Sequence, residues 1–226
     1  WFTVLDLKDT FFCLPLAKES QNLFAFEWQS PTSGRKTQIT WTVLPQGFKN
    51  SPTIFENQLA RELETWEPPS KEGTLLQYVD DLLIATKTKL ECIQWTVSLL
   101  NFLGLNGYRV SRQTAQMVQL QVTYLGYEIS KGQRELGTGL KEAICKTPPP
   151  QTVKELRTFL GMTGWCQLWI YNYGMIMKPL YKLLKNNPTQ LVWTKEAQNA
   201  FNILTKELMR TPALGSPDVT KPFWFF

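Results

Sequence analysis

An acidic pair lies between two apolar runs at residues 75–85, which read LLQYVDDLLIA. Two short apolar runs joined by a tight acidic corner are typical of a β-hairpin. Asp80 and Asp81 would then place two like charges at its tip, where they repel each other and resist burial. A divalent cation at the tip would offset that repulsion. The alternative is a solvated acidic turn, because turns favour aspartate.

A second acidic segment lies near the start of the sequence, at residues 2–12, which read FTVLDLKDTFF. Asp6 interrupts an otherwise apolar run that reads as a buried strand, and an unpaired charge in such a run is costly. We therefore expect Asp6 to have a partner, either a cation or a salt-bridging or capping group. Asp9 lies in the following turn, where an aspartate side chain commonly caps backbone N–H groups.

Asp6, Asp80 and Asp81 together form a candidate site for a hard cation. Mg²⁺ prefers oxygen ligands, and it takes few of them from the protein and the rest from water and substrate phosphates. Two such ions about 3.5–4 Å apart are the usual arrangement for in-line phosphoryl transfer. The sequence has no histidine, and its four cysteines lack the CxxC spacing of zinc ligands. A zinc site is therefore not expected.

Composition limits the class of protein further. The 226 residues are 43% hydrophobic, enough for a packed core, and a net charge of +5 with a pI near 9.0 suits a polyanionic partner. Scattered cysteines suggest free thiols in a reducing compartment. The sequence lacks a run of about 18 apolar residues that would predict a transmembrane helix, and it shows no targeting signal. We expect an intracellular protein.

Periodicity predicts an α+β fold, in which helices cover one face of an antiparallel sheet. Besides the first strand and the hairpin, we expect strands at Leu23–Trp28, Gln38–Leu44 and Gln121–Glu128 and helices at Ser51–Thr65, Glu91–Leu103, Thr152–Leu168 and Thr194–Met209. Thr152 and Glu155 have the spacing of a capping box. Pro148–Pro150 is the expected internal boundary. The apolar end, Trp224–Phe226, predicts a chain cut from a longer reading frame.

Four motifs resemble those of retroviral reverse transcriptases and follow the family's order. They are VLDLKD at residues 4–9 (motif A), LPQGFKNSP at 44–52 (motif B), YVDD at 78–81 (motif C) and YLGY at 124–127 (the primer-grip hairpin). A lone Tyr-x-Asp-Asp is a weak signal, whereas four ordered motifs are a strong one. The sequence is most similar to the gammaretroviral type of Pol polyprotein, as found in endogenous retroviruses, along essentially its whole length.

The resemblance implies a right-hand polymerase fold. The implied parts are a palm with truncated fingers at 1–128, a mostly helical thumb at 129–185 and part of the connection at 186–226. The implied activity is that of an RNA-directed DNA polymerase, and we expect the parent's ribonuclease H domain to be absent here. The implied cofactors are two Mg²⁺ ions, with Mn²⁺ as the alternative. The implied partners are a DNA primer on an RNA or DNA template and deoxynucleoside triphosphates, in the cytoplasm or the virion.

The resemblance also assigns roles to single residues. The metal ligands, three of them catalytic carboxylates, would be Asp6, Asp80, Asp81 and Leu7. The nucleotide pocket would comprise Asp9, Thr10, Phe11, Gln46 and Gly47, and the primer–template contacts Tyr78, Leu125, Gly126, Gly161 and Trp165. Phe11 would exclude a ribose 2′-hydroxyl; the alternative is a core phenylalanine. The corresponding alternatives are a simple turn for Gln46, a strand aromatic for Tyr78 and helix packing for Trp165.

Motif D departs from the family's pattern. Where family members carry lysines, this sequence has Gln113 and Thr114. Neither side chain can act as a general acid near neutral pH, and such catalysis typically contributes about 10²–10⁴-fold. We therefore expect impaired nucleotidyl transfer onto a primer 3′-hydroxyl. The alternative is a segment without catalysis, either a nucleic-acid-binding module or a relic of retroviral Pol.

Overall fold

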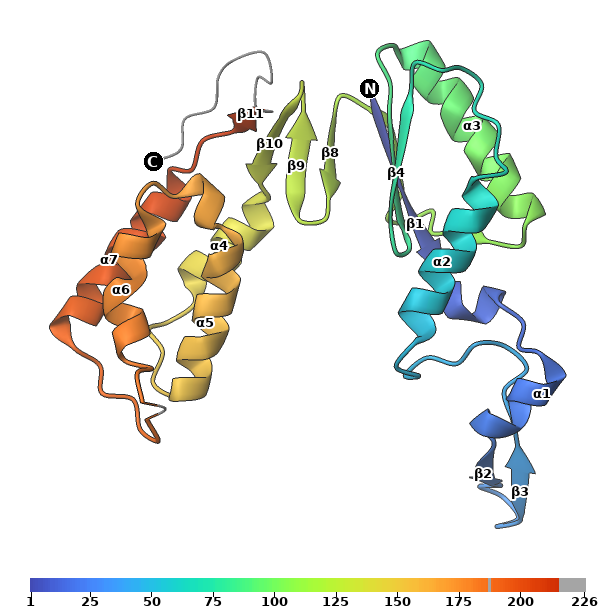
Figure 1. Cartoon of the computed structure of the whole chain (residues 1–226), viewed down its shortest axis with the longest axis horizontal. Helices are drawn as coiled ribbons and strands as arrows, with labels where there is room; N and C mark the ends of the chain where they lie inside the picture. The colour runs from blue at the N-terminus through green and yellow to red at the C-terminus, as the bar shows by residue number, and fades with distance from the viewer. Residues whose placement is uncertain (187, 216–226) are drawn as a thin grey trace. The chain divides into compact units, whose positions relative to one another are not determined.

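The computed structural model describes residues 1–186 and 188–215. Contacts divide the chain into two units, Trp1–Val122 and Thr123–Phe226 (Figure 1). Within the described residues, no helix combines the length and the apolar character needed to cross a membrane. The apolar end discussed above, Trp224–Phe226, lies outside the described residues.

The first unit is built on an antiparallel sheet. β1 pairs with β5 on one side and with the short strands β6 and β7 on the other, and β4 pairs with β5. The strands span Phe2–Lys8 (β1), Thr74–Tyr78 (β4), Asp81–Ala85 (β5), Arg109–Val110 (β6) and Gln116–Gln119 (β7). The predicted hairpin is confirmed, because β4 and β5 are antiparallel and a two-residue turn connects them.

Two helices cover one face of this sheet. α2 (Ser51–Leu63) and α3 (Lys89–Leu105) lie on the same side of it in Figure 1. The core of the unit contains Leu5, Leu7, Phe55, Leu59, Leu82, Ile84, Trp95, Leu99, Leu103 and Tyr108. Successive side chains of a strand point to opposite faces. Asp6, which stands between Leu5 and Leu7, therefore lies on the face away from the helices.

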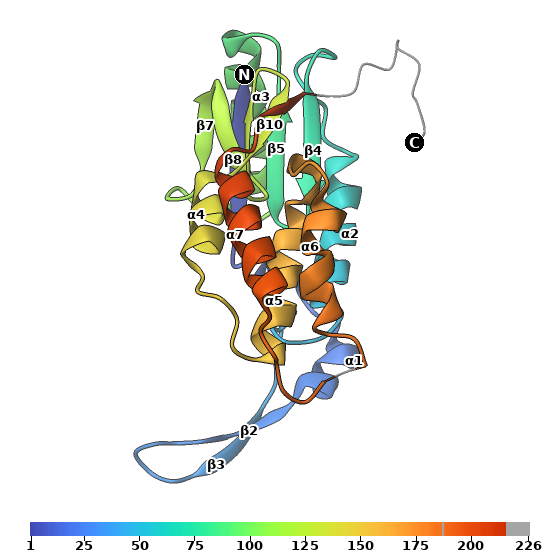
Figure 2. The same ribbon diagram turned by 90° about the vertical axis from the view of Figure 1, so that its left-hand side faces the viewer.

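A two-stranded ribbon extends from the first unit (Figures 1 and 2). Its strands are β2 (Phe26–Gln29) and β3 (Lys36–Ile39), and the chain before them forms η1 (Thr10–Cys13), α1 (Lys18–Gln21) and η2 (Asn22–Phe24). Every residue of β2 and β3 is exposed. The strands expected at Leu23–Trp28 and Gln38–Leu44 are therefore misplaced, since they overlap β2 and β3 only in part. The expected half-burial is wrong for Ile39, which is exposed, whereas Trp41 and Val43, beyond the end of β3, are half-buried. No second layer of described residues covers the ribbon.

The second unit combines a small sheet with helices. Its strands are ordered β11-β10-β9-β8, and β8 crosses the boundary between the units. They span Gln121–Tyr124 (β8), Tyr127–Ser130 (β9), Gln133–Leu136 (β10) and Leu214–Gly215 (β11). The helices are α4 (Thr138–Lys146), α5 (Val153–Trp165), η3 (Gln167–Trp169), α6 (Tyr173–Lys182) and α7 (Lys195–Met209).

The predicted helices correspond to α2, α3, α5 and α7, with small shifts at their ends. The strand-like residues predicted at Gln121–Glu128 fall in β8 and β9, which form the predicted hairpin, whereas α4, α6, β10 and β11 were not predicted. Pro148–Pro150, the expected internal boundary, lies inside the second unit. Residues on both sides of it, Ile144 and Leu156, belong to one core, so the proline run is a connection within that unit.

Candidate active site

Asp6 and Asp81 face each other on two paired strands. β1 and β5 are antiparallel, and their register places Asp6 opposite Asp81. Side chains in such positions have Cβ atoms about 4.5–5.5 Å apart. Tyr78 is opposite Asp81 on the other side, on β4, and its side chain is 56% exposed. One row across three strands therefore carries Asp6, Asp81 and Tyr78 on the face away from the helices.

Asp80 lies in the turn beside this row. Val79, the other turn residue, has a φ of 51°, which is rare for a β-branched residue. The side-chain amide of Gln77 donates to the Val79 carbonyl at 3.3 Å, and the N–H of Leu7 donates to the Asp80 carbonyl at 3.1 Å. Backbone strain of this kind persists where its surroundings fix it and is common at functional sites.

The Asp81 carboxyl is affected by burial and by the two other carboxylates. Burial raises the pKa of the Asp81 carboxyl above its ordinary value, and the charges of Asp80 and Asp6 raise it further. Across residues 1–186 and 188–215, no three His, Cys, Asp or Glu side chains are grouped closely enough to hold a metal ion. The donors nevertheless fit a hard divalent cation, because they are all carboxylates and their mutual repulsion favours a positive charge. Binding would have to draw them closer together.

Asp6 has a hydrogen-bond partner, and this partner is the hydroxyl of Thr114. Thr114 Oγ1 donates to Asp6 Oδ2 at 2.8 Å, and the N–H of Ser111 donates to the Asp6 carbonyl at 2.8 Å. Sequence reasoning singled out Thr114 only as a departure from motif D. No local signal links two residues that are 108 positions apart. The Leu7 side chain belongs to the core, so only its backbone is near these carboxylates.

Asp9 does not cap a helix with its side chain. It precedes η1 with a φ of 55°, and its carboxylate makes no capping hydrogen bond. Instead its carbonyl accepts from the N–H of Phe12 at 2.9 Å. Arg109 Nη1 lies 4.0 Å from Asp9 Oδ2, and the two side chains are 76% and 40% exposed, so this long ion pair contributes little. The capping alternative for Asp9 is wrong, and its carboxylate stays accessible.

Thr10 and Phe11 follow in η1, at the end of β1. Thr10 is buried, and Phe11 is half-buried against the core. The Phe11 ring meets Phe55 of α2 edge to face, with ring centres 6.0 Å apart. Phe11 thus packs against the core, and part of its ring remains accessible. Its role in selecting a sugar stays a prediction.

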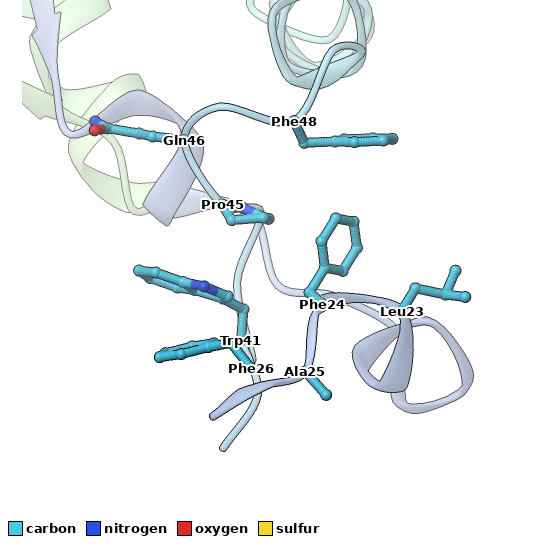
Figure 3. Close-up of a pocket in the computed structure, with 8 residues that line it drawn as sticks. All are labelled: Leu23, Phe24, Ala25, Phe26, Trp41, Pro45, Gln46 and Phe48. Carbon is cyan, nitrogen blue, oxygen red and sulfur yellow. The ribbon is translucent and has the colours of Figure 1, made fainter. Parts of the chain in front are cut away.

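Gln46 and Gly47 lie in the loop before α2. Gly47 has a φ of 88°, and a Cβ on it would meet nothing within 4 Å. Ser51 Oγ donates to the Pro45 carbonyl at 2.8 Å and ties this loop to the start of α2. Gln46 borders an aromatic hollow of about 610 Å³ beside the ribbon, lined by Leu23, Phe24, Ala25, Phe26, Trp41, Pro45, Gln46 and Phe48. In Figure 3 its side chain points away from Phe48.

Leu125 and Gly126 form the two-residue turn between β8 and β9. Their φ angles are 50° and 81°, the pattern of a hairpin turn with two left-handed residues. The Gly126 carbonyl accepts from the N–H of Gly137 at 3.0 Å. The predicted hairpin tip is confirmed as a structural element, and its contact with a primer stays a prediction.

Gly161 and Trp165 lie on one face of α5. A Cβ on Gly161 would meet nothing within 4 Å, so this stretch of helix has open space beside it. Trp165 is 54% exposed. Its ring stacks on Tyr127 of β9 with centres 5.6 Å apart, and Tyr127 also stacks on Trp169. Trp165 thus packs on a strand and still offers an exposed face.

The matches to known sequences are extensive. The family model described as "Reverse transcriptase (RNA-dependent DNA polymerase)" matches residues 1–129. The Gag-Pol polyprotein of Baboon endogenous virus (strain M7) is 53% identical over 226 residues, which are 100% of this chain and 13% of that protein. The Pol polyprotein of Feline endogenous virus ECE1 is 52% identical over the whole chain, which corresponds to 22% of its length. The chain thus spans a minor part of these relatives.

Solved structures match over nearly the whole chain. The foamy viral protease-reverse transcriptase dRH in complex with double-stranded DNA has a TM-score of 0.84 and 30% identity, covering 96% of this chain and 36% of that one. The foamy viral protease-reverse transcriptase in complex with an RNA/DNA hybrid has a TM-score of 0.81 and 31% identity, covering 95% of this chain and 28% of that one. These matches confirm the predicted α+β class.

Proposed function

The chain belongs to the reverse transcriptase family and has its palm-and-thumb fold, and on this basis we propose that it is the nucleotidyl-transfer segment of a retroviral Pol protein. The reaction would extend a DNA primer on an RNA or DNA template. The observation that carries the proposal is the acidic row: Asp6 faces Asp81 across two strands, and Asp80 lies in the adjoining turn. We assign residues 1–128 to the palm, 129–185 to the thumb and 186–226 to the connection.

The carboxylates would hold two Mg²⁺ or Mn²⁺ ions, together with the backbone of Leu7. When bound, such ions offset the charge that develops on the transferred phosphoryl group. Asp6, Asp80 and Asp81 fit this role by donor type, and the pKa of Asp81 is raised by burial and then by the charges of Asp80 and Asp6. The three carboxylates are half-buried at the hairpin end of the face away from the helices, and we place the primer end and the triphosphate on their accessible side.

Residues at the end of β1 and in the loop before α2 would bind the incoming deoxynucleotide. We assign this pocket to Asp9, Thr10, Phe11, Gln46 and Gly47. The exposed edge of the Phe11 ring would exclude a ribose 2′-hydroxyl. Gly47 would let the backbone approach the substrate closely, because glycine adopts its left-handed conformation without strain.

Each unit has residues that we assign to the primer and template. We assign these contacts to Tyr78 in the first unit and to Leu125, Gly126, Gly161 and Trp165 in the second. Tyr78 and Trp165 have exposed rings, and aromatic faces stack well on nucleic acid bases. The foamy viral structures are complexes with double-stranded DNA and with an RNA/DNA hybrid, which supports a duplex as the partner here.

A chimera tests this function. The 226 residues would replace the matching region of the Gag-Pol polyprotein of Baboon endogenous virus (strain M7), and RNA-templated primer extension would be measured. We expect extension above background that Asp80→Asn lowers by about 10²-fold or more, because one ligand of the ions is lost. Glu67→Gln, which neutralises an exposed charge in the loop between α2 and β4, serves as the control. A folded chimera that binds duplex without extending it would contradict the proposal.

The segment by itself should extend primers slowly or not at all. Gln113 and Thr114 supply no general acid at the place where the family has lysines, which lowers the expected rate. Rapid extension by the 226-residue chain, abolished by Asp80→Asn, would overturn this expectation.

The same departure in motif D favours a second candidate function, duplex binding without catalysis. The net charge of +5 suits a polyanion. This second function predicts that the affinity for a primer–template duplex falls steeply as the salt concentration rises, since phosphate contacts release counterions. Fluorescence anisotropy at several salt concentrations would measure it. Salt-independent binding, or none, would argue against this candidate.

A further inference from the structure

We propose that Thr114 is a positioning residue for Asp6: its hydroxyl fixes the Asp6 carboxylate in the orientation in which that carboxylate holds a divalent cation. This inference rests on the proposed function of the acidic row. It gives a role to a residue that replaces a lysine of motif D, at the position where the sequence alone indicated only a loss.

The hydroxyl–carboxylate contact is a short hydrogen bond in an exposed position. Thr114 Oγ1 lies 2.8 Å from Asp6 Oδ2, and hydrogen bonds to a charged acceptor are stronger than neutral ones. A threonine hydroxyl has a single proton to donate. It therefore engages Oδ2 and leaves the other carboxylate oxygen available to a cation.

The backbone holds Thr114 beside Asp6. The loop that carries it connects β6 to β7, and both of these strands pair with β1, on either side of Asp6 in the sequence: Leu7 pairs with Val110 and Val4 with Gln116. Within the loop, the N–H of Ser111 donates to the Asp6 carbonyl at 2.8 Å. Asp6 is thus fixed at its main chain by one loop residue and at its side chain by another.

A neutral donor suits this position. Asp6 lies beside Asp80 and Asp81, whose charges already influence one another. A cationic side chain hydrogen-bonded to Asp6 would compete with a divalent ion for the same carboxylate. A hydroxyl orients the carboxylate without neutralising it. Groups that orient metal ligands in this way typically change metal affinity by about 10–100-fold when they are removed.

The test uses the 226-residue chain and Mn²⁺, followed by electron paramagnetic resonance titration. Thr114→Val keeps the shape of the side chain and removes the donor, so we expect about 10-fold weaker Mn²⁺ binding. Thr114→Ser restores the hydroxyl and should bind within about twofold of the natural chain. Thr37→Val makes the same change on the exposed strand β3 and should have no effect. The Asp6→Asn variant shows how much of the Mn²⁺ binding depends on the acidic row.

A second readout needs no metal. In chains carrying ¹³C-labelled aspartate, the carboxyl resonance of Asp6 should shift in Thr114→Val and return in Thr114→Ser, with unchanged circular dichroism. Mn²⁺ binding that depends on Asp6 but is unchanged in Thr114→Val would overturn the role of Thr114 alone. The absence of any Mn²⁺ binding that depends on Asp6 would overturn the metal site of the proposed function, and this inference with it.

Discussion

At the scale of single residues, Gly137 shows how tightly the backbone supports the hairpin tip at Leu125 and Gly126. A Cβ on Gly137 would lie 2.6 Å from the Gly126 carbonyl oxygen, whereas a Cβ on Gly139, two residues later, would meet nothing within 4 Å. Gly137→Ala should therefore push the turn away and lower the free energy of unfolding of the second unit by about 1–3 kcal/mol. Urea denaturation measures this change.

Gly139→Ala is the matched control for that prediction. Gly139 lies inside α4, where alanine is favoured over glycine by up to about 1 kcal/mol. If Gly137→Ala lowers the free energy of unfolding and Gly139→Ala raises it, the loss in Gly137→Ala comes from the contact with the turn. Equal stabilisation by both would show that the backbone at Gly137 relaxes freely.

Cys166 predicts a pH dependence of stability. Burial in the second core raises the pKa of its thiol from its ordinary value to about 11. The folded chain therefore keeps the proton more firmly than the unfolded chain, and the stability gained is complete below about pH 9 and is lost as the pH rises toward 11. Relative to Cys166→Ala, the free energy of unfolding of the natural chain should fall by up to about 1.4 kcal/mol per pH unit in this window. Denaturation at pH 7.5 to 11 tests it, and parallel curves for both chains would contradict it.

At the scale of elements, the start of α5 depends on a local interaction. Thr152 Oγ1 accepts from the N–H of Glu155 at 3.1 Å, and the Glu155 carboxylate accepts from the N–H of Thr152 at 3.3 Å. Thr152→Ala should cost about 1 kcal/mol of stability, because a cap is lost. Thr158→Ala, on the exposed side of the same helix, should be near neutral. Thermal unfolding of both variants decides, and similar losses in the two would contradict the capping role of Thr152, because alanine is a better helix former than threonine at either position.

Local signals of this kind are the part of the fold that sequence reasoning captured. The capping box of α5 and the turn of the Asp80 hairpin depend on residues within a few positions of each other, so they can be read directly. A second capping box at Thr88 and Glu91, which starts α3, has the same spacing and was missed. α6 was hidden because it contains Pro179, a residue that ordinarily ends a helix.

Non-local contacts could not be predicted from the sequence. The alternation at Gln38–Leu44 predicted a half-buried strand, but burial depends on a second layer, and nothing in the local pattern shows whether one is present. The acidic row was predicted only as a convergence of three aspartates. Its register, with Asp6 opposite Asp81, and the Thr114 hydroxyl that joins it require the folded sheet.

At the scale of the whole molecule, each unit has its own core. One cluster draws all its members from the first unit, and the other draws all of its members from the second. Apolar packing is the main source of stability in each case. A defect placed in one core should therefore destabilise mainly the unit that contains it.

Two core truncations test this expectation. Phe159 is buried in the second core, where its ring lies 5.0 Å from that of Phe201, and Leu99 is buried in the first. Phe159→Ala should cost about 3–5 kcal/mol and Leu99→Ala about 2–5 kcal/mol. Hydrogen exchange should accelerate in α5 and α7 for the first variant and in β1 and β5 for the second, because units with separate cores open separately. Equal acceleration of all four elements by either variant would instead mean that the chain unfolds as one cooperative body.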